Sequence, residues 1–185
     1  MSGSERPAPR FALLEAGRQI LAEEGIAGLS LRAVTRRVGV SPTAAYRHFA
    51  DREHLLAAIA TSGVWELTTE LETADRTAAQ PLRAQAAAYL RFALANPALY
   101  RLIFGPKRFG HYPELESALA SAYGVLAARV AKHLTPSQQN AEKSFACWCA
   151  LHGLASLAVD AHLTTDGVSP QDQAEQLVIT IASTW

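Results

Sequence analysis

The chain has few cysteines, no net charge and no long uncharged run, and each shortage argues against a class of protein. Its two cysteines, Cys147 and Cys149, lie two positions apart in an apolar helical segment, where they point about 200° apart. This spacing argues against a disulfide or a shared metal ion and predicts buried free thiols in a reducing cytoplasm. No uncharged run reaches the ~20 residues that a membrane-spanning helix needs.

The net charge of zero, from 17 Lys and Arg against 17 Asp and Glu, argues against a protein that coats nucleic acid. The charge is unevenly distributed, however. Residues 1–56 carry 8 Lys and Arg against 6 Asp and Glu, a net +2, and residues 57–185 carry 9 against 11, a net −2. A modestly basic end suits a protein that touches DNA with one small module. The first ten residues hold no apolar core for a secretory signal, so we expect a cytoplasmic protein.

The sequence also lacks the alternating β-branched runs of a sheet, so the fold is predicted to be all-α. Apolar spacing, glycines and prolines predict about nine helices. They cover residues 9–24, 31–38, 42–46, 51–73, 81–96, 97–104, 114–134, 135–162 and 171–183, after a disordered tail at 1–8.

The segment from Leu29 to Leu56 is the most informative part of the chain. Ser30 is expected to cap the helix over 31–38, and Gly39 supplies a residue that can leave it with positive φ. Ser41 is expected to cap the next helix, with Pro42 at its first position. A short helix, a four-residue turn with glycine and a second short helix form a helix-turn-helix, whose second helix enters the DNA major groove.

The block VGVSPTAAYRHFADREHLL resembles the DNA-binding end of TetR-type (TetR/AcrR) transcriptional regulators. Tyr46, His48 and Phe49 stand in the Tyr-x-His-Phe element of that family, and residues 51–53 in its acidic-basic helix start. The chain departs at Thr35, where the family usually packs Ala between the two helices, so the helix crossing could shift slightly. The resemblance implies a helix-turn-helix domain over residues 1–55 and an effector-binding and dimerisation domain over 56–185. It also implies a homodimeric regulator, a ligand-responsive repressor, whose recognition helices change separation when a small molecule binds.

Nine residues are candidate DNA contacts because they combine polarity, charge or small size with a place on this motif. They are Ser30, Arg32, Ser41, Thr43, Ala44, Tyr46, Arg47, His48 and Arg52. Thr43 and Ala44 lie on the leading edge of the recognition helix and are expected to reach base edges. Arg52 is expected to contact phosphate at the start of the long helix that follows.

Alternatives remain for several of these residues. Tyr46 is either a phosphate contact or a core aromatic, and His48 either faces phosphate or packs on the motif. Ser41 can offer its hydroxyl to phosphate, although capping alone would explain it. Phe49 is predicted to be core.

The helix predicted over 135–162 holds a run without full charges from Ser144 to Val159, so it has little solvated face. A partner subunit is the simplest cover for it. The expected dimer interface comprises Ala155, Ser156, Val159, Leu177 and Ile181. The fragment CWCALHGLASLAVD also resembles a TetR subgroup with a Trp-His-Gly element, although Leu151 precedes His152 here and the nearest Trp is Trp148.

Aromatic residues of the C-terminal part are candidates for the wall of a ligand cavity between bundle helices. The candidates are Trp65, Tyr89, Phe92, Tyr100, Phe104, Tyr123, Phe145, Trp148 and His152. Each could equally be core. Together they favour a hydrophobic or aromatic effector over a sugar phosphate.

Other function classes find little support. Cys147 and His152 lie some 140° apart on a helix and cannot form a close nucleophile–base pair, and no metal, phosphate-loop or serine-elbow motif is present. We therefore expect no catalytic residue, no metal and no cofactor. An architectural DNA-binding protein would need a larger basic excess than this chain carries.

Overall fold

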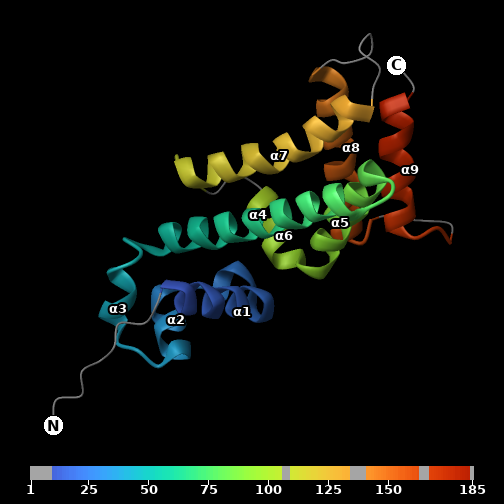
Figure 1. The fold of residues 1–185 in the computed structure, drawn as a ribbon. Helices are drawn as coiled ribbons and strands as arrows, with labels where there is room; N and C mark the ends of the chain where they lie inside the picture. The colour runs from blue at the N-terminus through green and yellow to red at the C-terminus, as the bar shows by residue number, and fades with distance from the viewer. Residues whose placement is uncertain (1–9, 106–108, 134–140, 163–166, 184–185) are drawn as a thin grey trace. The chain divides into compact units, whose positions relative to one another are not determined.

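The computed structural model describes residues 10–105, 109–133, 141–162 and 167–183, and within those ranges every regular element is a helix. The all-α prediction is confirmed, and Figure 1 shows the described helices in chain order. They are α1 (Arg10–Gly28), α2 (Leu31–Val38), α3 (Pro42–Tyr46), α4 (Arg52–Thr77), α5 (Pro81–Ala95), α6 (Pro97–Phe104), α7 (Pro113–His133), α8 (Ala141–Val159) and α9 (Pro170–Ser183). No helix in these ranges is both long and apolar enough to cross a membrane. The tail predicted at 1–8 and the helix start predicted at Thr135 lie outside the described residues.

The chain packs as two compact units. The first comprises Met1–Gly63 and Ala98–Leu115, and the second comprises Val64–Pro97 and Glu116–Trp185. Helix α4 therefore begins in the first unit and ends in the second, and α6 packs with the first unit. The sequence predicts a single division after residue 55, which would leave α6 with the C-terminal part.

The first unit is built on the local signals that the sequence carries. The Ser30 hydroxyl accepts a hydrogen bond from the backbone N–H of Ala33 at 3.1 Å, which caps α2 as predicted. Gly39 ends α2 in the left-handed region at φ 76°, and its N–H donates to the Arg36 carbonyl. Pro42 opens α3 at a position where its missing N–H has no consequence. Helix α1 breaks at Gly25 (φ 70°, ψ −171°), where the sequence predicts its end, although a further turn carries it to Gly28.

The core of the first unit holds α1, α2 and α3 together and joins them to the start of α4. Its large buried side chains are Leu13, Ile20, Leu21, Leu29, Val34, Phe49, Leu55 and Ile59. Thr35, at the position where the family that the chain resembles usually has Ala, is also buried, and its hydroxyl donates to the carbonyls of Leu31 and Arg32. Its own helix therefore satisfies the extra polar group. Helix α6 approaches α4 closely at Gly63, where an added Cβ would lie 2.8 Å from a methyl carbon of Leu99.

The second unit is organised around α5, which packs against α8 and α9, while α8 also packs on α9. Helix α5 is buried on most sides, through Leu82, Gln85, Ala86, Ala88, Tyr89, Leu90, Phe92 and Ala93. The remaining large core side chains come from every other helix of the unit, including Leu67, Leu71, Leu126, Val130, Leu151 and Val178. Because α5 has little solvent-facing surface, it positions the other helices of the unit.

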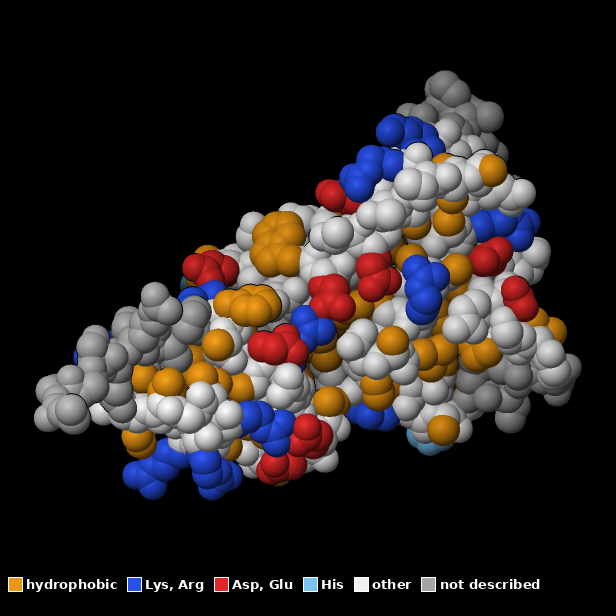
Figure 2. All heavy atoms as spheres, turned by 60° about the horizontal axis from the view of Figure 1, so that its bottom comes forward, with side chains coloured by type: hydrophobic (Ala, Val, Ile, Leu, Met, Phe, Trp, Pro, Cys, Tyr) orange, Lys and Arg blue, Asp and Glu red, His pale blue; other side chains and the backbone are white. Residues whose placement is uncertain are grey.

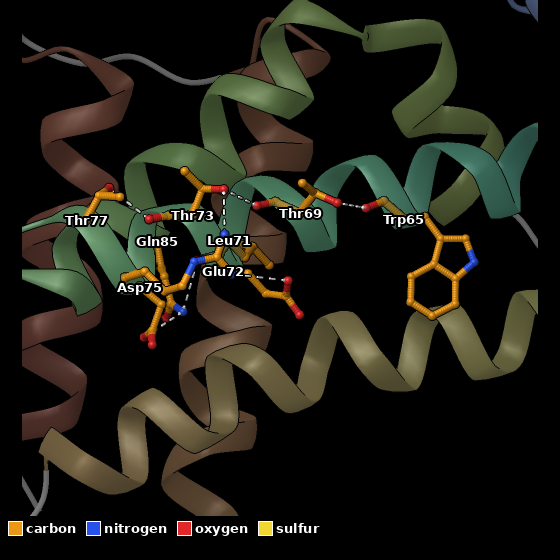
Figure 3. Close-up of polar contacts among 9 residues, drawn as sticks. Trp65, Thr69, Leu71, Glu72, Thr73, Asp75, Thr77 and Gln85 are labelled. Carbon is orange, nitrogen blue, oxygen red and sulfur yellow. Dashed lines mark hydrogen bonds and ion pairs between the residues drawn. The ribbon is translucent and has the colours of Figure 1, made fainter.

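A polar cluster ties α4, α5 and α7 together inside this unit. The buried Gln85 side chain donates through Nε2 to the Leu71 carbonyl at 3.4 Å and to Asp75 at 3.2 Å, as Figure 3 shows. Arg129 of α7 holds the same carboxylate with two hydrogen bonds of 2.5 and 2.8 Å. Hydrogen bonding to this guanidinium lowers the pKa of Asp75. The cluster therefore keeps Asp75 ionised and fixes the position of Arg129.

Helix α4 carries a series of threonines whose hydroxyls donate to the carbonyl four residues earlier. Thr69, Thr73 and Thr77 form three consecutive steps of 2.8–2.9 Å along one side of the helix in Figure 3. Thr61 and Thr68 make the same bond to Ala57 and Val64. Such bonds share a carbonyl between a hydroxyl and an amide, and they tend to bend a helix.

Candidate functional site

Helix α3 presents its polar side chains to solvent and anchors its apolar ones in the first unit. Thr43 is exposed, Ala44 is half-buried, and Tyr46 keeps 56% of its surface accessible. Ala45 and Phe49 are buried, so they hold α3 and the turn after it against the core. Phe49 is core, as predicted, and the Arg10 guanidinium lies 5.5 Å from its ring centroid. The exposed Tyr46 argues against the alternative that it is a core aromatic.

Four arginines of the motif differ in what they contact. Arg32, Arg36 and Arg47 are exposed, and no ion pair is recorded for them within the described residues. Arg37 instead forms a two-pronged ion pair with Glu23 of α1, at 3.0 and 2.6 Å. Figure 2 shows Lys and Arg side chains gathered along the lower edge of the left-hand end, where Figure 1 has α2 and α3. The exposed cations are therefore available to phosphate.

Arg52 begins α4, as predicted, and has backbone partners that the sequence does not indicate. Its Nε donates to the Leu29 carbonyl at 2.6 Å, and its Nη2 donates to the Ile26 carbonyl. Both carbonyls belong to the segment where α1 ends and α2 begins. A guanidinium whose fork is occupied by backbone oxygens primarily fixes the helix-turn-helix on the start of α4. The sequence does not indicate these two bonds, because Ile26 and Leu29 lie far from Arg52 along the chain, and the phosphate contact stays a prediction.

The two serines of the motif differ in whether their hydroxyls cap a helix. Ser30 uses its hydroxyl to cap α2, so this oxygen already has a partner. Ser41 occupies the cap position of α3 but makes no capping hydrogen bond with its side chain. The predicted capping by Ser41 is thus wrong, and its hydroxyl stays available to another group. His48 is exposed, with its ring 6.3 Å from that of Phe49, which leaves both of its alternatives open.

The start of α4 is capped by Asp51, as the sequence predicts. The Asp51 carboxylate accepts the backbone N–H of His54 at 2.9 Å, and the His54 imidazole lies at the same distance. The backbone hydrogen bond, followed by the imidazole contact, lowers the pKa of Asp51. An ionised carboxylate here stabilises the positive end of the helix.

A cavity of about 690 Å³, which the sequence does not indicate, lies within the first unit. It is bordered by residues 111–114, where α7 begins. The Gly110 N–H donates to the Glu53 carboxylate at 3.0 Å, and Tyr112 meets His54 edge to face at 5.3 Å. The lining residues are Arg10, His48, Phe49, His54, Ala57, Ala58, Thr61, His111, Tyr112, Pro113 and Glu114. Because they come from separate segments, no local pattern could indicate this cavity.

In the second unit, three of the predicted pocket aromatics form one cluster. The Trp148 ring meets Tyr89 edge to face at 5.4 Å and Tyr123 at 5.7 Å. The Tyr89 hydroxyl lies 3.1 Å from Nδ1 of His152. Burial lowers the pKa of His152, which favours the neutral imidazole. This cluster joins α5, α7 and α8.

The other predicted pocket aromatics do not join that cluster. Phe92 is buried in α5, whereas Phe145 and Trp65 keep 60% and 47% of their surface accessible. Tyr100 and Phe104 form a tilted pair at 5.0 Å on α6, in the first unit. Phe145, Tyr100 and Phe104 therefore lie apart from the cluster around Trp148, and their part in a ligand pocket stays a prediction. The sequence shows which residues are aromatic but not which way each helix faces.

The predicted dimer residues differ in burial, because they lie on different faces of α8 and α9. Ala155 is fully buried within its own unit, so a partner subunit does not reach it, and this assignment is corrected. Ser156, Val159, Leu177 and Ile181 are half-buried. The large exposed apolar side chains of α8 are instead Phe145 and Leu157. They lie twelve residues apart, which spans about 18 Å of helix.

The described residues offer no constellation suited to catalysis. Cys147 is buried, and burial raises the pKa of its thiol to about 11, so it stays protonated at neutral pH. Cys149 is exposed, contrary to the prediction that both thiols are buried. Within the described part of the chain, no group of three or more His, Cys, Asp or Glu is arranged to hold a metal ion.

Comparison with protein families gives two matches. Residues 13–59 match "Bacterial regulatory proteins, tetR family", and residues 82–181 match "Tetracyclin repressor-like, C-terminal domain". The HTH-type transcriptional regulator Rv1816 of Mycobacterium tuberculosis (strain ATCC 25618 / H37Rv) is 32% identical over 105 residues. That alignment covers 54% of this chain and 45% of the relative, so the match spans about half the length of this curated relative.

Solved structures share the fold along nearly the whole chain. A protein from Rhodococcus sp. RHA1 superimposes with a TM-score of 0.80 at 29% identity, covering 98% of this chain and 97% of that one. A bacterial regulatory protein in the tetR family from Rhodococcus RHA1 gives a TM-score of 0.68 at 21% identity, with 93% and 94% covered. The second likeness shows the fold alone.

Proposed function

Because the chain belongs to the TetR family of DNA-binding transcriptional regulators, we propose that it is a homodimeric, ligand-responsive repressor of a palindromic operator. It acts in the cytoplasm and releases the operator when a small hydrophobic or aromatic molecule binds its second unit. A finer assignment, to the subgroup with a Trp-His-Gly element, is supported by Trp148, His152 and Gly153 alone.

The main support for DNA binding is the way in which α3 exposes its polar side chains while its apolar ones are buried. Thr43 and Tyr46 face solvent, while Ala45 and Phe49 lock the helix onto the core. A rigid helix with a polar outer edge can enter the major groove, where Thr43 reads base edges and Ala44 touches a thymine methyl. Tyr46, Arg47 and the Ser41 hydroxyl supply contacts to phosphate.

The exposed face of α8 supports the homodimer. Phe145 and Leu157 are accessible, and no residue from Ser144 to Val159 carries a full charge. An apolar helix face of this length is a typical interface between identical subunits, and a two-fold dimer reads a two-fold operator. Half-site centres are then roughly one helical turn or somewhat more apart, on one side of the duplex.

The aromatic cluster of Tyr89, Tyr123 and Trp148 supports an apolar or aromatic effector. Edge-to-face rings offer faces on which a further aromatic ring packs well, and a neutral His152 adds a polar group without a charge. The effector releases DNA only to the extent that it binds the released state more tightly than the bound state.

Selection of bound duplexes from a random pool tests the DNA-binding proposal. We expect one enriched motif with two-fold symmetry and a footprint confined to one or a few such sites. Broad coating of DNA would indicate an architectural protein instead. An enriched motif without two-fold symmetry would contradict a dimer on a palindrome.

A melting screen with aromatic and aliphatic compounds tests the effector proposal. Compounds that raise the melting temperature of the parent are then titrated against the operator complex. Trp148→Leu should abolish both the rise in melting temperature and the release of operator DNA, while operator affinity without the compound stays unchanged. A compound that releases DNA equally from parent and Trp148→Leu would place the effector elsewhere.

A further inference from the structure

A second cavity, of about 390 Å³, lies within the second unit where α5 begins and α7 ends. Its walls come from α5, α7, α9 and the residues before α5. The lining residues are Ala79, Gln80, Pro81, Leu82, Arg83, Arg129, Lys132, His133 and Ile179. Four of them are basic and none is acidic, although the chain as a whole carries no net charge.

The charges of this cavity are largely uncompensated within the protein. Arg129 is held by Asp75 through two hydrogen bonds, which fixes one wall. For Arg83, Lys132 and His133, no ion pair or hydrogen bond is recorded within the described residues. Three groups that can carry positive charge thus meet in one hollow, and the nearby Asp75, which also interacts electrostatically with Lys132, is already held by Arg129.

The start of α5 adds to this positive potential. Gln80, at the cap position, makes no side-chain capping bond, and the first turn of α5 contains no acidic residue. Pro81 has no N–H, and the Ala84 N–H is taken by the Gln80 carbonyl. The N–H groups at Leu82 and Arg83 therefore lack partners within their helix.

Helix stability does not explain the position of Arg83. Lys132 and His133 lie in the last turn of α7, where positive charge stabilises a helix. Arg83 lies in the first turn of α5, where positive charge opposes the helix dipole. An anion in the cavity would turn this unfavourable placement into a favourable one.

We infer that this cavity binds a small molecule that carries an oxyanion, with an apolar group beside it. Arg83 and Lys132 meet the negative charge from α5 and α7, and the N–H groups at the start of α5 donate to its oxygens. Leu82, Pro81 and Ile179 form the apolar wall. A phosphate ester and a carboxylate share this chemistry, and the site is separate from the neutral aromatic cluster around Trp148.

Calorimetric titration of the full chain at low ionic strength, without DNA, tests this inference. Phenyl phosphate and benzoate represent the two oxyanions, inorganic phosphate the anion alone, and benzyl alcohol the apolar group alone. We expect at least one of the two aromatic anions to bind once per chain, more tightly than inorganic phosphate, and benzyl alcohol not to bind. The tighter of the two identifies the preferred oxyanion.

Substitutions assign the binding to this cavity. Arg83→Gln and Lys132→Gln should each weaken binding about ten- to a hundredfold, as expected for loss of a charged hydrogen bond. Arg76→Gln is the matched control, because Arg76 is an exposed arginine of the same unit that does not line the cavity. Arg83→Gln should also melt no lower than the parent without ligand.

Three results would overturn the inference. They are no binding of either aromatic anion at millimolar concentration, equal binding by the parent and both cavity variants, or equal weakening by Arg76→Gln. The titration contains no DNA, so its outcome is independent of whether the proposed operator binding holds.

Discussion

Replacing Arg52 with Ala separates a structural role from a DNA-contacting role at the junction of α1, α2 and α4. The guanidinium donates to two backbone carbonyls, those of Leu29 and Ile26. A hydrogen bond from a charged group contributes about 1.5–3 kcal/mol when it is buried. The Leu29 bond is only partly buried and the Ile26 bond is exposed, so water replaces much of both. We therefore expect Arg52→Ala to lower the free energy of unfolding by about 1–2 kcal/mol.

For a chain of this size, such a loss lowers the melting temperature by roughly 2–8 °C. Thermal and urea unfolding, followed by circular dichroism, measure it directly. Arg52→Lys should recover only part of the loss, because an ammonium group cannot reproduce the two-pronged geometry of a guanidinium. Arg47→Ala is the matched control, since Arg47 is exposed and has no recorded partner in the described residues. It should weaken DNA binding without changing the melting temperature.

One combination of results would contradict the structural role of Arg52. If Arg52→Ala melts like the parent while the salt dependence of operator binding falls by about one unit, Arg52 acts as a phosphate contact. The carbonyl bonds would then contribute nothing measurable to stability.

Further predictions concern the DNA surface, the dimer and acid stability. Thr43→Ala should weaken operator binding by about 1–3 kcal/mol and relax preference at one base pair per half-site; an unchanged selected motif would remove Thr43 from base readout. Tyr46→Phe should weaken binding to cognate and unrelated DNA alike, without a change in melting temperature. Leu157→Arg should shift the protein towards monomer in light scattering, whereas Thr69→Arg on α4 should not. Asp75→Asn should destabilise the protein at neutral pH, because Arg129 lowers the folded-state pKa of Asp75. That stabilisation is present above the unfolded-state pKa and is lost as pH falls through the folded-state pKa, so urea unfolding should show the difference from the parent shrinking in acid.

The helix-turn-helix was predictable because its signals are local. Ser30, Gly39 and Pro42 each determine the backbone within a few residues, and the structure places each at the expected helix end. The bounds of α2 and α6 match the predicted ranges, and α5 ends one residue earlier than predicted. Caps, glycine turns and prolines act over short distances, so a sequence displays them directly.

The orientation of side chains in the second unit was less predictable. Ala155 faces the core and Leu157 faces solvent because α5 and α9 cover one side of α8. An uncharged run looks the same on all sides in the sequence, so it indicates an interface without indicating its face. The bonds of Arg52 and the cavity lined by Arg83 and Lys132 depend on segments far apart along the chain, and no spacing rule connects those segments.

The threonine series of α4 has a mechanical consequence. Each hydroxyl shares a carbonyl that already accepts an amide, and such bonds slightly destabilise a helix and often bend it. These steps occupy the part of α4 that belongs to the second unit, while the part in the first unit carries a single such bond, at Thr61. We therefore expect any bend in α4 to lie in the part that belongs to the second unit. Replacing Thr69, Thr73 and Thr77 with alanine should then straighten this part of α4 and stabilise it slightly.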